Sequence, residues 1–348
     1  MKSNLILSLP AVLAGFLALS TAPGRAEDPY HLLKEIPVGG EGGWDYVSVD
    51  SAARRLYVSH ATKVVVIDLD QETVVGDIAD MPGVHGVALA PELQRGFVSC
   101  GRANKAAVVD LKTLRTTSWV PTGENPDGML YDPSRQEVYM FNGRGKSATV
   151  FEAKTGQVVA TIPLGGKPEF AAVDTKAGRV FNNLEDKSEV VVLDTKTHAV
   201  TGRWSIAPGE EASGMAFDEA NHRLFLGCGN KLMVMMDSVS GKVVASVPIG
   251  DGVDANAFDP ETRLAFASCG GDGTVTIAHE DAPDKLTVVQ TLKTERGSKT
   301  MTIDPKTHKI YVPAAKFEAP AAGQRRGKAV PGSFRILVYG TGNAPAAK

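Results

Sequence analysis

Seven stretches of the chain share one pattern, in which a loop rich in glycine and proline leads into a short apolar segment that ends near aspartate. They read GGWDYVSVD (42–50), PGVHGVALA (82–90), ENPDGMLYD (124–132), GKPEFAAVD (166–174), EASGMAFDE (211–219), DGVDANAFD (251–259) and RGSKTMTID (296–304). They recur about every 42 residues. A fixed period of this length is the sequence signature of a repeat architecture. The chain is therefore expected to contain seven copies of one structural unit.

Each copy continues, after a turn, with a second apolar segment centred on an aromatic residue. These aromatics are Tyr57, Phe97, Tyr139, Phe181, Phe225, Phe266 and Tyr311. Third segments follow, such as KVVVIDL (63–69) and SEVVVLD (188–194), and fourth segments are clear at 73–78, 156–162 and 241–247. Four strands per unit are typical of a propeller blade, and a fixed aromatic fills the space between stacked blades. The sequence predicts an all-β, seven-bladed propeller of four-stranded antiparallel blades.

The ring is expected to close by pairing the two ends of the repeat region. The last copy reaches its third strand at 335–338 and then runs into a tail rich in proline and alanine, without a fourth strand. Upstream of the first copy, LLKEI (32–36) resembles a missing fourth strand. We therefore predict that residues 31–36 complete the blade of residues 293–340. This pairing would remove two exposed strand edges, which otherwise promote aggregation.

Length and composition indicate a folded chain with no strong field for polyanions. Of the 348 residues, 43% are hydrophobic and 22% charged, with a net charge of −3. Such a chain can bury a sizeable core. The near-neutral balance argues against nucleic acid or an anionic membrane as a partner, since both need a basic surface.

The first 26 residues read as a secretory signal, with Lys2, an apolar run over residues 5–19, and the small residues of GRA (24–26) at a cleavage site. The run is broken by Pro10 and is shorter than the ~20 residues that span a bilayer. We expect this segment to be cleaved, which leaves a periplasmic or secreted protein without a stable membrane span. A single propeller domain over 27–340 and a tail over 341–348 are expected.

The second strands LYVSH (56–60) and IYVP (310–313) resemble the Tyr-Val-Thr-Asn segment of the YVTN β-propeller, or YncE-like, family of exported proteins. The Thr-Asn half of that segment is mostly absent here. The resemblance covers nearly the whole chain after residue 26 and implies the seven-bladed fold. It implies no single function, because such propellers serve as binding surfaces, as cofactor-associated subunits and as lactonase-like enzymes.

In each copy, the loop that enters the first strand and the loop that leaves the second strand are expected to open on the same face, around the channel. Two rings of residues are expected on this face. The first ring stands at the start of the innermost strands and comprises Asp45, His85, Asp127, Glu169, Ser213, Asp254 and Lys299. Converging carboxylates perturb one another's pKa values and offer oxygen ligands to a divalent metal ion such as Ca²⁺ or Mg²⁺. The candidate metal ligands are Asp45, His85, Asp127, Glu169 and Asp254; a hydrated polar channel entrance is the alternative.

The second ring ends the second strands and comprises His60, Cys100, Asn142, Leu184, Cys228, Cys269 and Ala314. Three cysteines at one repeat position suggest a metal or haem site beside His60, but CxxC, CxxCH and HExxH are all absent. Buried packing is the favoured interpretation. Cys228 and Cys269 lie in adjacent blades, so a disulfide between them is also conceivable.

Beyond the second ring, Arg102 and Arg144 stand in loops where they could bind an anionic group. The strongest departure from the repeat is an insertion of about 20 residues over 314–333, which contains the basic cluster Arg325, Arg326 and Lys328. Long insertions that overhang a site are often functional. We expect either a flap or partner-binding loop over the channel mouth, or a disordered excursion.

Three functions are compatible with these features. The leading one is a binding or scaffold protein that recognises a ligand or a protein partner at the channel face. The second is a metal-assisted hydrolase or lactonase-like enzyme, in which ring carboxylates would hold the metal ion and His85 would act as general base. The third is an accessory subunit of a periplasmic redox system.

Overall fold

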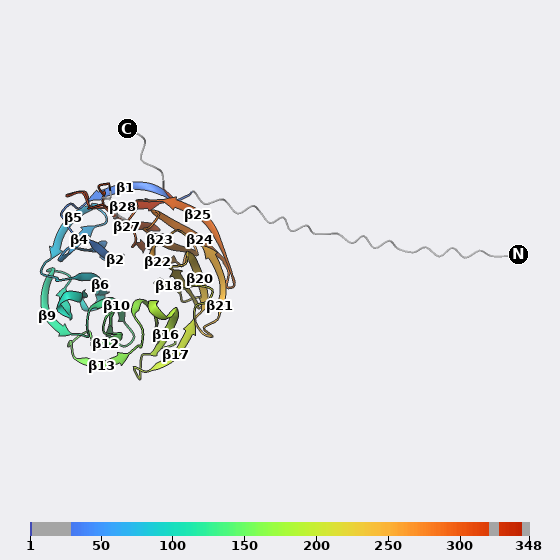
Figure 1. Cartoon of the computed structure of the whole chain (residues 1–348), viewed down its shortest axis with the longest axis horizontal. Coiled ribbons are helices and arrows are strands. Elements are labelled where there is room, and N and C mark those ends of the chain that lie inside the picture. Colours follow the sequence, from blue (N-terminus) through green and yellow to red (C-terminus); the bar gives the residue numbers. More distant parts are fainter. Residues whose placement is uncertain (2–28, 320–326, 343–348) are drawn as a thin grey trace, which may run out of the picture.

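The chain folds into a closed ring of blades. The computed structural model describes residue 1 and residues 29–319 and 327–342. Within these residues, 28 strands form seven four-stranded antiparallel sheets, arranged side by side around a central axis (Figure 1). The predicted all-β, seven-bladed propeller is confirmed.

The first four blades follow the chain in order. Blade one contains β2 (Trp44–Asp50), β3 (Arg55–His60), β4 (Lys63–Asp68) and β5 (Thr73–Ile78). Blade two contains β6 (Val84–Ala90), β7 (Arg95–Cys100), β8 (Lys105–Asp110) and β9 (Arg115–Pro121). Blade three contains β10 (Pro126–Asp132), β11 (Glu137–Asn142), β12 (Ser147–Glu152) and β13 (Val158–Pro163). Blade four contains β14 (Pro168–Asp174), β15 (Arg179–Leu184), β16 (Glu189–Asp194) and β17 (Val200–Ser205).

The remaining blades include the closure. Blade five contains β18 (Ala212–Asp218), β19 (Arg223–Cys228), β20 (Leu232–Asp237) and β21 (Val243–Pro248). Blade six contains β22 (Val253–Asp259), β23 (Leu264–Cys269), β24 (Thr274–Ala282) and β25 (Lys285–Lys293). Blade seven contains β26 (Thr302–Asp304), β27 (Lys309–Ala314), β28 (Arg335–Gly340) and β1 (His31–Pro37). Three short 3-10 helices lie in loops: η1 (Pro91–Leu93), η2 (Gly101–Ala103) and η3 (Glu185–Lys187).

The aspartate that ends most of the innermost strands closes the turn that follows. In blade one, Asp50 Oδ1 accepts a hydrogen bond of 2.8 Å from the backbone N–H of Ala53. In blade four, Asp174 Oδ1 accepts one of 2.9 Å from Ala177. Aspartate is favoured here because its short carboxylate can satisfy a backbone donor of the turn. The recurring aspartate in the sequence is thus a turn signal, at the face opposite the channel mouth.

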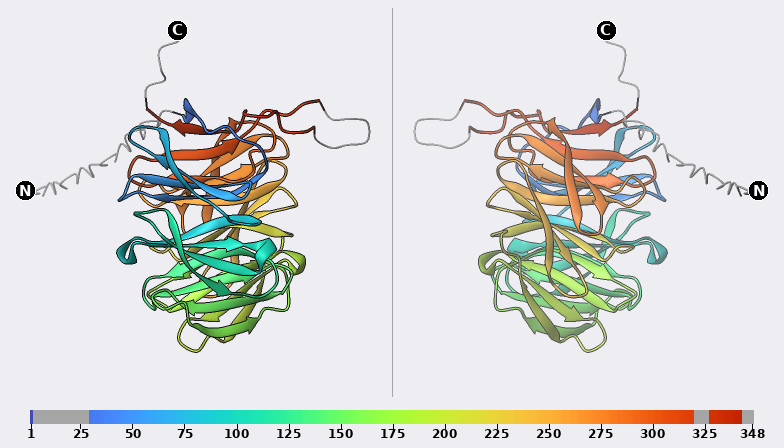
Figure 2. Two further views of the ribbon diagram at one scale, coloured as in Figure 1. Left: turned by 90° about the vertical axis from the view of Figure 1, so that its left-hand side faces the viewer. Right: turned by 90° about the vertical axis from the view of Figure 1, so that its right-hand side faces the viewer.

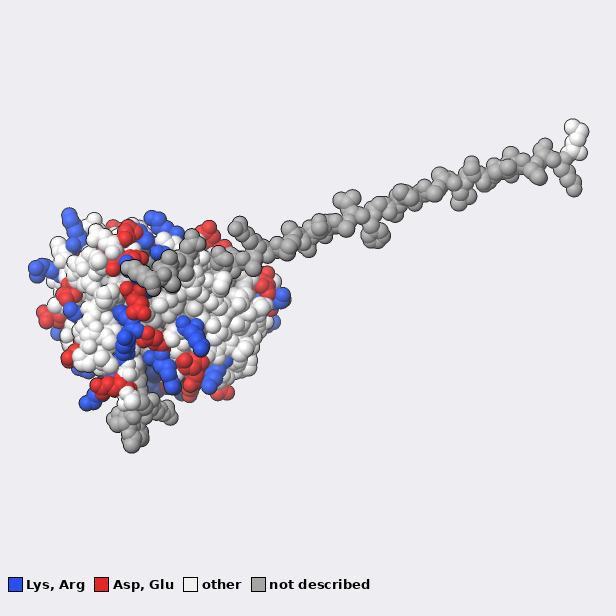
Figure 3. Space-filling model, turned by 90° about the horizontal axis from the view of Figure 1, so that it is seen from above, with Lys and Arg blue, Asp and Glu red and all other residues white. Residues whose placement is uncertain are grey.

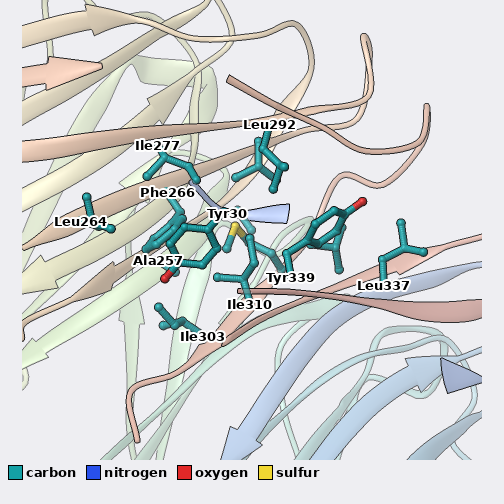
Figure 4. Packing of buried hydrophobic residues seen from close by; sticks show 14 of the residues in the cluster. Tyr30, Ala257, Leu264, Phe266, Ile277, Leu292, Ile303, Ile310, Leu337 and Tyr339 are labelled. Atoms are coloured by element: carbon teal, nitrogen blue, oxygen red, sulfur yellow. The ribbon is translucent and has the colours of Figure 1, made fainter. Parts of the chain in front are cut away.

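The hydrophobic core is divided among the seven interfaces between neighbouring blades, with one cluster of buried residues at each. The seven predicted aromatics of the second strands are all at most 2% exposed. Figure 4 shows the cluster between blades six and seven, where Phe266 packs with Ile303 and Ile310. The blades are therefore held together by apolar contacts between sheets, while hydrogen bonds hold the strands within each sheet.

Blade seven is completed by the N-terminal strand, as predicted. Strand β1 pairs with β28 in antiparallel register, from His31 opposite Gly340 to Pro37 opposite Arg335. Ile36 is fully buried against blade one, and Tyr30 packs edge-on against Phe266 of blade six, with ring centroids 5.4 Å apart. The first described segment of the chain therefore joins three blades.

No helix in the described part of the chain is long and apolar enough to cross a membrane. The expected signal segment and most of the expected C-terminal tail lie outside the described residues.

Candidate binding site at the channel mouth

The residues of the first ring are positioned by a recurring irregularity in the innermost strands. In blade one the register between β2 and β3 shifts between Trp44 and Val47, around Asp45, and a shift stands at the corresponding place in blades two to six. A β-bulge leaves a residue out of the ladder and redirects its side chain. Because of these bulges, the first-ring side chains of blades one to six do not follow the regular alternation of side chains between the two faces of a sheet.

Five members of the first ring form a chain of alternating charge, which we call the charge arc. Lys299 Nζ lies 2.5 Å from Asp254 Oδ2 and 3.1 Å from Asp45 Oδ1. His85 Nδ1 lies 2.8 Å from Asp45 Oδ2 and 3.3 Å from Asp127 Oδ1. The arc thus runs through blades six, seven, one, two and three, with a carboxylate at each end.

Blades four and five do not continue the charge arc. Glu169 of blade four lies 2.7 Å from the Nζ of Lys167, which also contacts the carboxylate of Glu185. Ser213 of blade five is buried, and its carbonyl oxygen accepts a hydrogen bond of 2.9 Å from Asn183 Nδ2. The charge arc is therefore interrupted at blades four and five, where Glu169 belongs to a separate ion-pair cluster.

The groups in the middle of the charge arc favour one another's charged forms. Burial alone would raise the pKa of Asp45, but the hydrogen bond to His85 and the charge of Lys299 bring it below its usual value. Burial would lower the pKa of His85, but Asp45 and Asp127 together raise it. Burial likewise opposes the charge on Lys299, and the carboxylates of Asp254 and Asp45 outweigh it, so the pKa of Lys299 is raised.

The carboxylates at and beyond the Asp127 end of the arc are short of positive charge. Burial, together with the charge of Asp45, raises the pKa of Asp127 to about 6, against the opposing charge of His85. Burial and the charge of Asp127 raise the pKa of Glu169 to about 7, in spite of Lys167. Both side chains are less than one-fifth exposed. Neighbouring carboxylates whose pKa values lie near neutrality are a frequent feature of functional sites.

Two aromatic rings meet across the channel in a tilted arrangement, near these carboxylates. Tyr46 of blade one and Phe170 of blade four have ring centroids 4.4 Å apart. The hydroxyl of Tyr46 is buried and makes no hydrogen bond with any described residue. Burial and the charges of Asp127 and Glu169 raise the pKa of this hydroxyl well above its usual value. Both rings also line the cavity of the inner channel.

Below the aromatic pair, the inner channel holds a cavity of about 340 Å³. Its walls combine apolar side chains such as Met129, Met215 and Met301 with polar groups such as those of Ser48 and Asn256. The position of Tyr46 and Phe170 is occupied by glycine in three other blades, at Gly86, Gly128 and Gly214. A Cβ on Gly86 would lie 2.7 Å from the Cβ of Tyr46, so the small residue makes room for the ring. This exchange of aromatics for glycines could have been noticed in the repeat alignment.

The second ring lies inside the blades rather than at the mouth. Its seven members are all at most 2% exposed. The imidazole of His60 stacks on Phe334, with ring centroids 4.1 Å apart, and burial lowers its pKa. The three cysteines are free thiols, so the conceivable disulfide between Cys228 and Cys269 is not formed. Burial raises the pKa of each thiol to about 12, which keeps it protonated and inert.

The basic candidates beyond the second ring are separate from the charge arc. Arg102 and Arg144 are exposed in their loops, as is Lys328 in the insertion. Arg325 and Arg326 lie outside the described residues. On the side visible in Figure 3, basic and acidic side chains are interspersed, without a broad patch of one sign.

The insertion between β27 and β28 begins and ends as a two-stranded ribbon, which we call the insertion ribbon (316–319 and 327–330). Phe317 pairs with Ala329, and the N–H of Glu318 donates a hydrogen bond of 2.9 Å to the carbonyl of Lys328. Phe317 also packs against Trp44 of blade one, with ring centroids 6.1 Å apart. Figure 2 shows the described part of the ribbon standing out from one face of the disc. Its described residues Phe317 and Glu318 line one pocket together with Lys299 of the first ring.

The comparisons with known proteins agree with the fold. No protein-family model and no curated protein matches the sequence. Among solved structures, a chain of Kuenenia stuttgartiensis hydrazine synthase is similar, with a TM-score of 0.68. The two share 15% sequence identity, and the match covers 78% of this chain and 92% of that chain. At this identity the likeness shows the fold alone.

Proposed function

We propose that the protein is a binding protein that recognises a cationic ligand, or a cationic group of a partner, at its channel mouth. The observation that carries this proposal is the pair of carboxylates Asp127 and Glu169, whose pKa values are raised to about 6 and about 7. A raised carboxylate pKa reports that the ionised form lacks compensating charge or solvation. A bound cation would supply that charge.

The contacts of Lys299 within the charge arc indicate which kind of cation would bind between Asp127 and Glu169. There, the ammonium of Lys299 lies between the carboxylates of Asp254 and Asp45, which come from different blades. An organic ammonium group or a divalent metal ion between Asp127 and Glu169 would repeat this arrangement on the other side of His85. Both ligands are bound through charged oxygen acceptors.

The pH dependence of binding follows from the two pKa values. Cation binding requires ionised carboxylates, and at about pH 6 a large share of Asp127 and Glu169 is protonated. Affinity should therefore rise between about pH 6 and about pH 8, where both groups lose their protons.

Isothermal titration calorimetry tests the proposal with Ca²⁺, Mg²⁺, Mn²⁺, Zn²⁺ and putrescine at about pH 6 and about pH 8. We expect stoichiometric binding of at least one cation, tighter at the higher pH and at least tenfold weaker in the double variant Asp127→Asn/Glu169→Gln. Glu210→Gln removes an exposed carboxylate from a loop on the same face and serves as the matched control. Failure of every cation to bind, or equal losses in both variants, would falsify the proposal.

A metal-assisted hydrolase is the second candidate, favoured by one observation. Ligand atoms of Asp45, His85 and Asp127 all lie within 4.8 Å of one another, close enough for a single metal ion. Asp45 is also held by Lys299, so a metal ion there would have to displace that contact. Metal-dependent hydrolysis of a lactone or ester panel, lost in Asp45→Asn, would support this function over simple binding.

We also propose that the chain is an exported member of the YVTN-like propellers, with residues 1–26 removed. The segments LYVSH and IYVP support the family relation, and the apolar N-terminal run supports export. A role beside a periplasmic redox enzyme is the remaining alternative, because propellers of the resembling family also serve as cofactor-associated subunits. Intact mass of the protein recovered after bacterial secretion would show whether residues 1–26 are lost.

A further inference from the structure

A pocket of about 520 Å³ lies where the insertion ribbon meets the loops of blades six and seven. The ribbon contributes Phe317, Glu318 and Gly327, and the blade loops contribute Asp251, Gly252, Gly270, Gly271, Arg296, Gly297 and Lys299. We call it the ribbon pocket. Its volume is in the range of small-molecule sites in proteins. Lys299 of the charge arc is part of its wall, so the ribbon pocket adjoins the channel mouth.

Much of the ribbon pocket wall is bare main chain, because the loops there approach too closely for side chains. A Cβ on Gly270 would lie 2.7 Å from the Cβ of Lys299 and 3.0 Å from its Cα. Gly252 has a left-handed φ of 65°, and a Cβ there would lie 2.9 Å from the nitrogen of Gly271. These glycines let the loops pack and leave space for a ligand above them.

One cation and one anion of the ribbon pocket have no ionic partner among the described residues. The guanidinium of Arg296 is oriented by a hydrogen bond of 3.1 Å from its Nε to the carbonyl of Gly271, and it forms no ion pair there. Glu318 likewise forms no ion pair with a described residue. The other two charged groups are compensated, since Lys299 contacts two carboxylates and Asp251 lies 3.4 Å from Lys231.

We propose that the ribbon pocket binds a small zwitterion with an aromatic side chain, of the class of an aromatic α-amino acid. The carboxylate of the ligand would pair with Arg296, its ammonium with Glu318, and its ring would pack with Phe317 over the glycine wall. Arginine suits a carboxylate because its planar fork can donate two parallel hydrogen bonds. This site is separate from the Asp127 and Glu169 pair and does not depend on that pair.

Calorimetric titration with L-phenylalanine and two truncated analogues tests the proposal. Phenethylamine lacks the carboxylate and 3-phenylpropionate lacks the ammonium, so each should bind about tenfold or more weakly than phenylalanine. Arg296→Gln should lower phenylalanine affinity by about tenfold to a hundredfold and leave phenethylamine affinity unchanged, because only the carboxylate contact is lost. Glu318→Gln should show the converse, weakening phenylalanine but not 3-phenylpropionate.

Matched controls separate this site from the channel mouth. Arg115→Gln makes the same charge change at an exposed position of blade two and should bind phenylalanine normally. Asp127→Asn/Glu169→Gln should also retain phenylalanine binding, whatever happens to cation binding. Because Arg296 and Glu318 are exposed, their variants should unfold at the same temperature as the parent protein. The proposal is overturned if phenylalanine does not bind at millimolar concentration, if an analogue binds as tightly, or if Arg296→Gln behaves like Arg115→Gln.

Discussion

Glu280 on β24 is a fully buried carboxyl at the face opposite the channel mouth. It faces Asp218 of blade five, and Asn221 Nδ2 donates to both carboxylates, over 2.8 Å to Asp218 Oδ2 and 3.3 Å to Glu280 Oε2. Burial, the hydrogen bond with Asp218 and the charge of Asp218 raise the pKa of Glu280 to about 7. The carboxyl of Glu280 therefore keeps its proton at mildly acidic pH, at the interface between blades five and six.

The proton on Glu280 makes the free energy of unfolding depend on pH. Glu280 keeps its proton in the folded chain up to about pH 7 but loses it near its ordinary value of 4.5 in the unfolded chain. The folded state therefore binds more protons between these values, and the free energy of unfolding should fall across this window as pH rises, by on the order of 2 kcal/mol. Urea unfolding at a series of pH values measures the fall. In Glu280→Gln the contribution of Glu280 should be missing, so the fall should be smaller than in the parent protein, while the contribution of Asp127 and Glu169 remains; an unchanged profile would contradict the assignment.

At the scale of elements, β1 determines how the ring closes. Its backbone completes blade seven, and Tyr30, just before it, is held by residues of blades six and seven. The hydroxyl of Tyr30 donates a hydrogen bond of 2.7 Å to the carbonyl of His308, and Gln290 exchanges two hydrogen bonds with the backbone of Tyr30. Arg335 Nε of β28 lies 2.9 Å from Glu35 Oε2. These contacts resist peeling of an edge strand from the ring.

Substitutions in β1 should lower the free energy of unfolding more when the side chain that is lost is buried than when it is exposed. Ile36→Ala removes a fully buried side chain between blades seven and one and should lower the free energy of unfolding by about 2–5 kcal/mol. Leu32→Ala, at a side chain that is 41% exposed in the same strand, should change it by less than about 0.5 kcal/mol. Urea unfolding measures both. A chain beginning at Val38 should unfold far more readily, and equal stability of that chain would contradict the closure.

The insertion ribbon is an element with little role in closure but a defined role in the ribbon pocket. Replacing residues 318–328 with a short glycine-rich turn keeps Phe317 and its contact with Trp44. The variant should unfold within a few degrees of the parent protein, because long surface loops contribute little to stability. It should lose phenylalanine binding and retain cation binding. Loss of cation binding as well would mean that the two sites are one.

At the scale of the whole molecule, the repeat made the architecture predictable from the sequence. One aromatic residue per copy predicts one core cluster per blade interface. The missing fourth strand of the last copy predicts that residues 31–36 close the ring. A repeat alignment compares equivalent positions, and equivalent positions have equivalent surroundings in a ring. Its predictions are therefore strongest for features that every blade shares.

The alignment could not show contacts that break the repeat. Tyr46 and Phe170 meet across the channel from blades one and four, which are not neighbours in sequence or in the ring. Lys167 neutralises part of Glu169 from a loop position that carries no recurring charge. The second ring looked equivalent to the first, yet its side chains, such as His60, point between blades and are buried. These differences decide where charge remains uncompensated, and hence where a ligand can bind.

The most direct test of the central claim is the number of protons released when a cation binds at the channel mouth. Titration at about pH 6.5, in two buffers of different ionisation enthalpy, measures this number. Because Asp127 and Glu169 hold protons near that pH, their pKa values being about 6 and about 7, binding should release a measurable fraction of a proton or more. The release should vanish in Asp127→Asn/Glu169→Gln. Cation binding without proton release, or release that persists in this variant, would contradict the account.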